Sequence, residues 1–194
     1  MWCMAISERP LFESIEGLPG TGKSTVAPLL AEARQAVLVP TVPPFYQPLR
    51  RELDPYENAD ARMCFFLSAL FTASDQIRRY LDAGIPVVVE SYFARCLTTH
   101  SVFGAKLEVA LPDDLPQPVT YQLVCEPGER LKRLAERDKQ MTRWDVLGEQ
   151  HADQLAIAYR RFPIHQVDTT TGTPDEAVRT ILSFNVTGAN RVNH

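Results

Sequence analysis

The sequence predicts an α/β domain with a mainly parallel sheet, and three observations support this fold class. Short apolar runs typical of strands alternate with segments of helical periodicity. A glycine-rich loop lies between the first such run and the first helical segment. The 194 residues, 45% of them hydrophobic, are enough for one core. We therefore expect a single domain over residues 1–184 and a loose polar tail over residues 185–194.

The glycine-rich loop has the spacing G-x-x-x-x-G-K-[ST] of a phosphate-binding loop. Glycine adopts positive φ at no steric cost, so the loop can turn its N–H groups toward a polyphosphate. Lys23 opens a helix whose N-terminus attracts anions, and Ser24 offers a hydroxyl to Mg²⁺. The alternative is a helix-capping turn that matches by accident. The predicted nucleotide-binding residues are Gly17, Leu18, Pro19, Gly20, Thr21, Gly22, Lys23, Ser24 and Thr25.

A strand before the loop and a helix after it are the context that this motif requires. Residues 11–16 are apolar enough for a strand, although two glutamates weaken the pattern. Residues 24–34 carry an apolar stripe at three- and four-residue spacing. Further strands are expected at 36–39, 85–90, 119–125 and 165–168, and further helices at 58–83, 129–138, 150–161 and 174–184.

Residues 41–55 are expected to form an extended, stiff loop because they contain four prolines. The loop carries Phe45, Tyr46 and Arg50, and an aromatic pair beside an arginine suits a ring and an anion. We predict that these residues contact the substrate. Ordinary packing of an irregular loop is the alternative.

The helix expected at 58–83 is apolar nearly all round in its middle, which predicts burial on more than one side. A homodimer through residues 59–83 would supply this cover. Burial in one thick core would supply it equally well.

A central strand at 85–90 ends in Glu90. In P-loop enzymes an acid at this position holds Mg²⁺, and ligands bind at the carboxyl ends of parallel strands. We therefore predict that Ser24 and Glu90 hold magnesium, and that Tyr92 and Arg95, on the following turn, face the substrate. A surface acid at a strand end is the alternative for Glu90.

A basic segment follows the helix at 129–138 and includes Arg137 and Arg143. Phosphoryl transfer needs cations on the transferring group, so these two arginines are predicted to act as a catalytic lid. A solvated basic face is the alternative.

The composition and the spacing of residues argue against several classes of protein. The net charge of −4 argues against a nucleic-acid binder, and no apolar run is long enough to cross a bilayer. The N-terminal residues lack the features of a signal peptide. The four cysteines are far apart and without metal-ligand spacing, so we expect reduced thiols and a cytoplasmic protein.

With these motifs in view, the chain resembles the thymidylate kinase and deoxynucleoside kinase group of P-loop phosphotransferases over about residues 12–184. The matching segments are Ile15-Glu16-Gly17, the helix ending at Ala83-Gly84, Val87 to Val89 followed by an acid, Leu131 to Arg137 leading to Arg143, Ala158-Tyr159, Val167-Asp168-Thr169 and Pro174-Asp175-Glu176. The resemblance implies a three-layer P-loop NTPase fold with a five-stranded parallel sheet and a short basic lid. It also implies ATP as donor, Mg²⁺ as cofactor, and adenine near residues 168–173.

The chain departs from this family where the substrate binds. Ser91 follows Glu90 where the family has arginine, and Val39-Pro40 lacks the family's glutamate. An arginine expected inside the long helix is replaced by apolar residues near Ala69. These departures remove the family's usual phosphate clamp and its usual base.

The resulting expectation is an ATP-dependent phosphotransferase that moves the γ-phosphoryl group to a small acceptor, a nucleoside or nucleotide. Lys23 would bridge the phosphates, and Arg137 and Arg143 would stabilise the transferring group. A kinase of a secondary metabolite or antibiotic is one alternative. A regulator that binds ATP without transferring phosphate is another.

Overall fold

The structure is a computed structural model that describes residues 10–137 and 141–184. The predictions for the first nine residues and for the tail at 185–194 therefore lie outside the described residues. The elements in chain order are β1 (Phe12–Gly17), α1 (Lys23–Ala33), β2 (Val37–Val39), the 3₁₀ turn η1 (Pro44–Tyr46), α2 (Gln47–Leu53), α3 (Ala59–Asp82), β3 (Val87–Glu90), α4 (Phe93–Val102), β4 (Val119–Val124), α5 (Pro127–Ala135), α6 (Arg143–Gln150), α7 (Ala152–Tyr159), β5 (Ile164–Asp168) and α8 (Pro174–Ser183).

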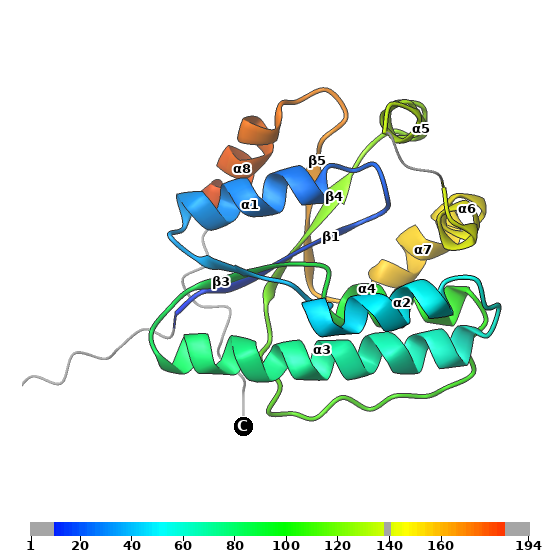
Figure 1. Ribbon diagram of the computed structural model, residues 1–194. Helices are drawn as coiled ribbons and strands as arrows, with labels where there is room; N and C mark the ends of the chain where they lie inside the picture. The colour runs from blue at the N-terminus through cyan, green and yellow to red at the C-terminus, as the bar shows by residue number, and fades with distance from the viewer. Residues whose placement is uncertain (1–9, 138–140, 185–194) are drawn as a thin grey trace, which may run out of the picture.

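The five strands form one parallel sheet in the order β2-β3-β1-β4-β5, which confirms the predicted fold class (Figure 1). β1 is the middle strand, and all six of its residues are buried. Its register places Ile15 opposite Glu90 of β3 and Gly17 opposite Leu123 of β4. The carboxyl ends of β1 and β3 therefore lie side by side, where parallel sheets bind their ligands.

Helices cover both faces of the sheet, so the domain has three layers (Figure 1). On one face, α1 and α8 pack through Leu30 and Ile181 against Ile15 and Leu123. On the other face, α3 and α4 pack against β1, β2 and β3. Among the described residues, no helix combines the length and the apolar composition needed to span a membrane.

Helix α3 is covered on several sides by its own chain. Its residues share a core with β1 and β3, and Val109 and Leu115 from the long connection before β4 pack into that same core. Tyr46 of η1 lies edge-on against Phe65 at 5.7 Å between ring centroids. The apolar residues that suggested a homodimer thus have partners within the chain, and the homodimer through 59–83 stays a prediction.

Three α-helices and one 3₁₀ turn were not predicted. The prediction of an extended loop over residues 41–55 was wrong, since this segment contains η1 and α2; prolines are favoured in the first turn of a helix, where no N–H is needed. Helix α6 begins at a capping box in which Thr142 and Asp145 bond each other's backbone N–H groups. Helix α4 has no side-chain N-cap, and its buried face packs on α3 and α7. Tertiary packing therefore stabilises α4.

The two glutamates of β1 are buried without breaking the strand because each has partners. Glu13 accepts two hydrogen bonds of 3.0 Å from Arg34, at the end of α1, and one of 3.1 Å from the Tyr121 hydroxyl. Glu13 is 1% exposed and Arg34 is 22% exposed. The bidentate pair thus fixes α1 to the middle of the sheet.

We predict that Arg34→Met lowers the free energy of unfolding by about 2 kcal/mol, because it leaves a buried carboxylate without its charged partner. Urea unfolding followed by circular dichroism measures the loss. Arg179→Met is the matched control, since Arg179 is 69% exposed and 3.8 Å from Glu176, and its cost is expected to stay below about 0.5 kcal/mol. Equal losses in the two variants would contradict this account.

Candidate active site

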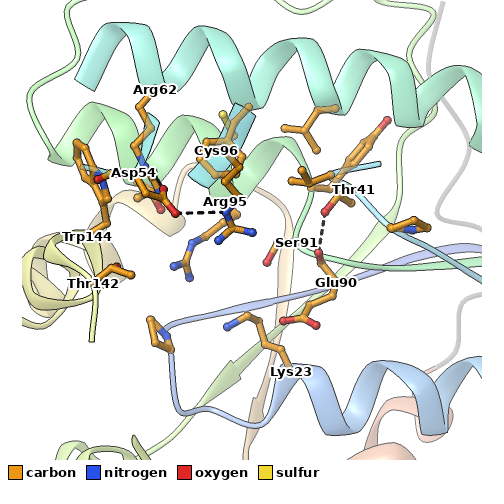
Figure 2. Close-up of a pocket in the computed structure, with 18 of the residues that line it drawn as sticks. Lys23, Thr41, Asp54, Arg62, Glu90, Ser91, Arg95, Cys96, Thr142 and Trp144 are labelled. Carbon is orange, nitrogen blue, oxygen red and sulfur yellow. Dashed lines mark hydrogen bonds and ion pairs between the residues drawn. The ribbon is translucent and has the colours of Figure 1, made fainter. Parts of the chain in front are cut away.

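A cavity of about 840 Å³ opens at the carboxyl ends of β1, β2 and β3 (Figure 2). Its walls come from the P-loop, the segment after β2, and helices α2, α3, α4 and α6. Lys23 and Glu90 lie on one side of it, and Arg62 and Trp144 lie on the other. Residues far apart in the sequence are thus brought to one site at the expected edge of the sheet.

The P-loop has the backbone conformation that only glycine adopts easily. The φ angles are 137° at Gly17, 86° at Gly20 and 97° at Gly22. A Cβ atom on Gly17 would lie 2.6 Å from the carbonyl oxygen of Leu123, and one on Gly20 would lie 2.8 Å from that of Arg130. The glycines therefore allow both the turn and its close packing against β4 and α5.

Several backbone amides of the loop are left for a ligand. In the described part of the chain, the N–H groups of Gly20, Gly22, Lys23 and Ser24 have no hydrogen-bond acceptor. They lie at the N-terminus of α1, where the helix dipole adds positive potential. This arrangement binds phosphate oxygens in other proteins.

Lys23 is desolvated at the mouth of the loop. Its Nζ donates a hydrogen bond of 2.9 Å to the carbonyl oxygen of Leu18. Burial lowers the pKa of Lys23 to about 7, and the positive charge of Arg95 acts in the same direction, against the negative charges of Glu90 and Glu16. A polyphosphate next to Lys23 would raise this pKa again.

Glu90 ends β3, and Figure 2 shows its carboxylate beside the ammonium group of Lys23. Thr41 donates a 3.0 Å hydrogen bond to the backbone carbonyl of Glu90 and so links the ends of β2 and β3. Ser24 lies in the first turn of α1 and is exposed.

These residues fit Mg²⁺ in one particular way. The described residues contain no group of three acidic, histidine or cysteine side chains able to hold a metal alone. Magnesium in nucleotide sites usually takes one or two protein oxygen ligands together with phosphates and water. The Glu90 carboxylate and the Ser24 hydroxyl are a donor set of that size and chemistry.

Sequence reasoning missed the role of Glu16. Its buried carboxylate accepts hydrogen bonds from the Ser14 hydroxyl at 2.8 Å and from the Tyr92 amide at 2.7 Å. Ser91, between Glu90 and Tyr92, has a φ of 66°, which is unusual for a residue other than glycine. Glu16 thus holds the turn that follows Glu90. Burial raises the pKa of Glu16 to about 7, against the effect of these hydrogen bonds.

The structure places three of the five predicted substrate residues in the cavity wall: Arg50, Tyr92 and Arg95. Arg95 donates to the backbone carbonyl of Gly17. Phe45 and Tyr46 are outside the cavity wall. Phe45 is 70% exposed, and the Tyr46 hydroxyl bonds Ser68 and Thr72 of α3.

The two predicted lid arginines have different positions. Arg137 lines the cavity just after α5. Arg143 begins α6, is 47% exposed and forms an ion pair with Glu57 outside the cavity wall. The structure brings Arg137 to the site and holds Arg143 at its edge.

Helix α6 contributes residues that the sequence did not single out. The ring of Trp144 lies 4.5 Å from the guanidinium of Arg62, and its Nε1 donates 3.0 Å to the carbonyl of Asp54. Arg62 also forms an ion pair with Asp54. Arg62 lies in α3 two turns before Ala69, near which the family's arginine is expected, and it belongs to the cavity wall. In the sequence, the capping box at residues 142–145 is the local pattern that indicates the start of α6.

Positive side chains outnumber negative ones in the cavity wall. They are Lys23, Arg50, Arg51, Arg62, Arg95 and Arg137, against Asp54, Glu90 and Asp145. Asp54 is paired with Arg62, and Asp145 caps α6. The cavity is therefore suited to anionic ligands.

A parallel sheet with this loop at its middle strand defines the chain as a P-loop protein. No protein-family model matches the sequence. It is 28% identical over 139 residues to a probable thymidylate kinase of Pyrobaculum calidifontis, covering 66% of this chain and 72% of the relative.

Two solved structures are similar. Thymidylate kinase from Candida albicans has a TM-score of 0.70 and 18% identity, over 90% of each chain. Deoxyadenosine kinase from M. mycoides, solved with dATP, has a TM-score of 0.61 and 16% identity, over 88% of this chain and 96% of that one. These likenesses confirm the predicted resemblance to P-loop nucleoside and nucleotide kinases, and the two solved structures share the fold of this chain.

We predict that ATP affinity falls with rising pH above about pH 7, because the amine of Lys23 must take up a proton to bind phosphate and its pKa in the free protein is about 7. The Kd for ATP should rise by up to about tenfold per pH unit, measured by calorimetry in excess magnesium.

Lys23→Arg is the matched control for this pH effect. Arginine keeps its charge throughout the range, while Glu16 is unchanged in the variant. The rise of the Kd for ATP with pH should therefore disappear in Lys23→Arg, even if this variant binds ATP more weakly. A wild-type Kd that is flat up to pH values two units higher would show that Lys23 is already charged in the free protein.

Proposed function

We propose that the chain is an ATP-dependent kinase that transfers the γ-phosphoryl group of ATP to a nucleoside or a nucleotide. One observation carries this proposal: the P-loop, several of whose amides have no acceptor among the described residues, contributes Lys23 to a cavity whose opposite wall is rich in arginine. The loop suits the phosphates of a donor, and the rest of the cavity leaves room for an acceptor directly beside them.

In this proposal the donor phosphates lie in the loop from Gly17 to Thr25, with Lys23 bridging the β- and γ-phosphates. The segment 168–173 is proposed to hold the adenine. Its position supports this, because the Thr169 hydroxyl donates 2.9 Å to the carbonyl of Thr21 in the loop. Arg133 of α5 donates to the carbonyl of Thr169 at 2.7 Å and so fixes that segment to α5.

Ser24 and Glu90 would hold Mg²⁺, and Glu16 would keep the turn after Glu90 in place. When bound, the ion neutralises phosphate charge. Arg137 and Arg95, which flank Lys23 in the cavity wall, are proposed to stabilise the transferring group. Arg143 would join them only after leaving Glu57.

The reaction forms a bond between an acceptor oxygen and the γ-phosphorus and breaks the bond from that phosphorus to the β,γ-bridging oxygen, which leaves with ADP. A phosphate acceptor attacks as an anion, whereas a hydroxyl acceptor loses a proton.

The small size of the acceptor and the absence of a nucleic-acid or membrane partner are part of the proposal. So is a cytoplasmic location, for which the free thiols of Cys64, Cys96 and Cys125 are support.

The test is incubation of the protein with ATP, magnesium and a panel of nucleosides, nucleoside monophosphates and unrelated metabolites, with ADP and products measured by mass spectrometry. At least one nucleoside or nucleotide should be phosphorylated. Lys23→Ala should lower kcat/KM by about 10²-fold or more, because it removes a preorganised cation from the phosphates. Lys132→Ala is the control, since Lys132 is 66% exposed on α5.

Three other outcomes would contradict the proposal. Phosphorylation of an unrelated metabolite alone would indicate a different kinase. Tight ATP binding with no product from any acceptor would indicate a regulator. Equal activity in Lys23→Ala and Lys132→Ala would place the chemistry elsewhere.

A further inference from the structure

Helix α4 turns one continuous face toward the cavity. The lining residues recur at three- and four-residue intervals, as residues on one helix face do. They are Arg95, Cys96, Thr99, His100 and Phe103, directly after Tyr92. Arg95 contacts the P-loop, and His100 follows five residues later, a rise of about 7.5 Å along the axis. His100 thus lies further from the P-loop along the same wall of the cavity.

The hydrogen bonds of His100 fix its tautomer. Its Nδ1 is 2.7 Å from the backbone carbonyl oxygen of Cys96 and 3.6 Å from the Cys96 thiol. A carbonyl oxygen only accepts hydrogen bonds, so Nδ1 carries the hydrogen. The other nitrogen, Nε2, therefore has a lone pair and is an acceptor. Burial lowers the pKa of His100 to about 4, and the charges of Arg62 and Arg95 act in the same direction, so the ring is neutral at physiological pH.

The acceptor atom Nε2 has no partner within the described residues. His100 is 3% exposed and belongs to the cavity wall. The Thr99 hydroxyl, on the same cavity face, is buried and also has no partner among the described residues. An unsatisfied buried acceptor destabilises the free protein, and a ligand that donates a hydrogen bond to it removes this cost.

The side chains around His100 form flat walls. The Phe66 ring is 5.5 Å from the His100 ring, and Phe103 stacks on Trp144 at 5.7 Å with 28° between the planes. The Arg62 guanidinium lies over both Phe66 and Trp144, at 4.9 and 4.5 Å. Flat aromatic and guanidinium surfaces favour a planar ring over an aliphatic chain.

We propose that His100 determines acceptor specificity by accepting a hydrogen bond at Nε2 from an N–H group on the edge of the acceptor's ring. The inference rests on the proposed kinase function. The acceptor is thus a planar heterocycle with an N–H edge, and the group that receives the phosphoryl group lies on its P-loop side. The Thr99 hydroxyl, which can donate or accept, would bond a neighbouring atom of the same edge.

The experiment compares matched ligand pairs in which methyl groups replace the N–H hydrogens. The pairs are thymidine and thymidine monophosphate with their N3-methyl derivatives, guanosine monophosphate with its N1-methyl derivative, and adenosine monophosphate with its N6,N6-dimethyl derivative. Calorimetry gives the Kd of each in the presence of ADP and magnesium, and turnover with ATP gives kcat/KM. The proteins are wild type, His100→Phe, which keeps a ring, and His100→Gln, which keeps an acceptor oxygen.

In at least one pair, wild type should bind the N–H compound about tenfold or more tighter than its methylated partner. His100→Phe should reduce that ratio to near one, and His100→Gln should restore most of it. The matched control is His165→Phe, which changes an exposed histidine of β5 and should leave the ratio unchanged. A purely structural role of His100 would change stability and ATP affinity but not the ratio.

Nitrogen-15 NMR of the histidine rings in the wild-type protein tests the inference without any variant. His100 should show an unprotonated Nε2 whose signal moves when the N–H ligand binds and not when the methylated one binds. A protonated Nε2, or a ratio unchanged in His100→Phe, would overturn the inference and leave the kinase function intact. Absence of turnover with every acceptor would overturn both.

Discussion

The turn from β1 into α1 is the constraint on which the site depends. Three residues with positive φ, Gly17, Gly20 and Gly22, let the chain leave the middle of the sheet and enter a helix within six residues. The turn packs so closely on Leu123 and Arg130 that Cβ atoms on the first two glycines would overlap backbone carbonyls. Because β1 is the central strand, the turn leaves the sheet between the carboxyl ends of β3 and β4.

The ionisable side chains around the turn are desolvated, which has an energetic cost. Lys23 and Glu16 are both desolvated, and the pKa of each moves to about 7 in the direction of the neutral form. Ser91 keeps a strained backbone so that Glu90 ends its strand beside Lys23. In the proposed function, a bound phosphate chain and its metal ion would offset these costs, as in preorganised phosphoryl-transfer sites.

The sequence predicts what depends on local spacing and misses what depends on packing. The P-loop, the parallel sheet and the family resemblance follow from residues close together in the chain. Helix α4 has no side-chain N-cap that would indicate its start in the sequence. Helix α6 does have such an indication, the capping box of Thr142 and Asp145. The Arg62–Trp144 contact joins residues 82 positions apart in the chain, and no local pattern indicates it. Phe45 was predicted from its residue type and its neighbours in the sequence, which do not fix the direction of a side chain.

The most direct test of this account is hydrogen exchange of the backbone amides from Gly17 to Thr25, with and without magnesium and ATP. Since several of these N–H groups have no acceptor within the described residues, they should exchange quickly in the free protein. Saturating nucleotide should slow them by about 10²-fold or more, while the amides of α8 on the same face stay unchanged. Exchange at residues 17–25 that does not respond to nucleotide would contradict the claim that this loop binds the phosphates.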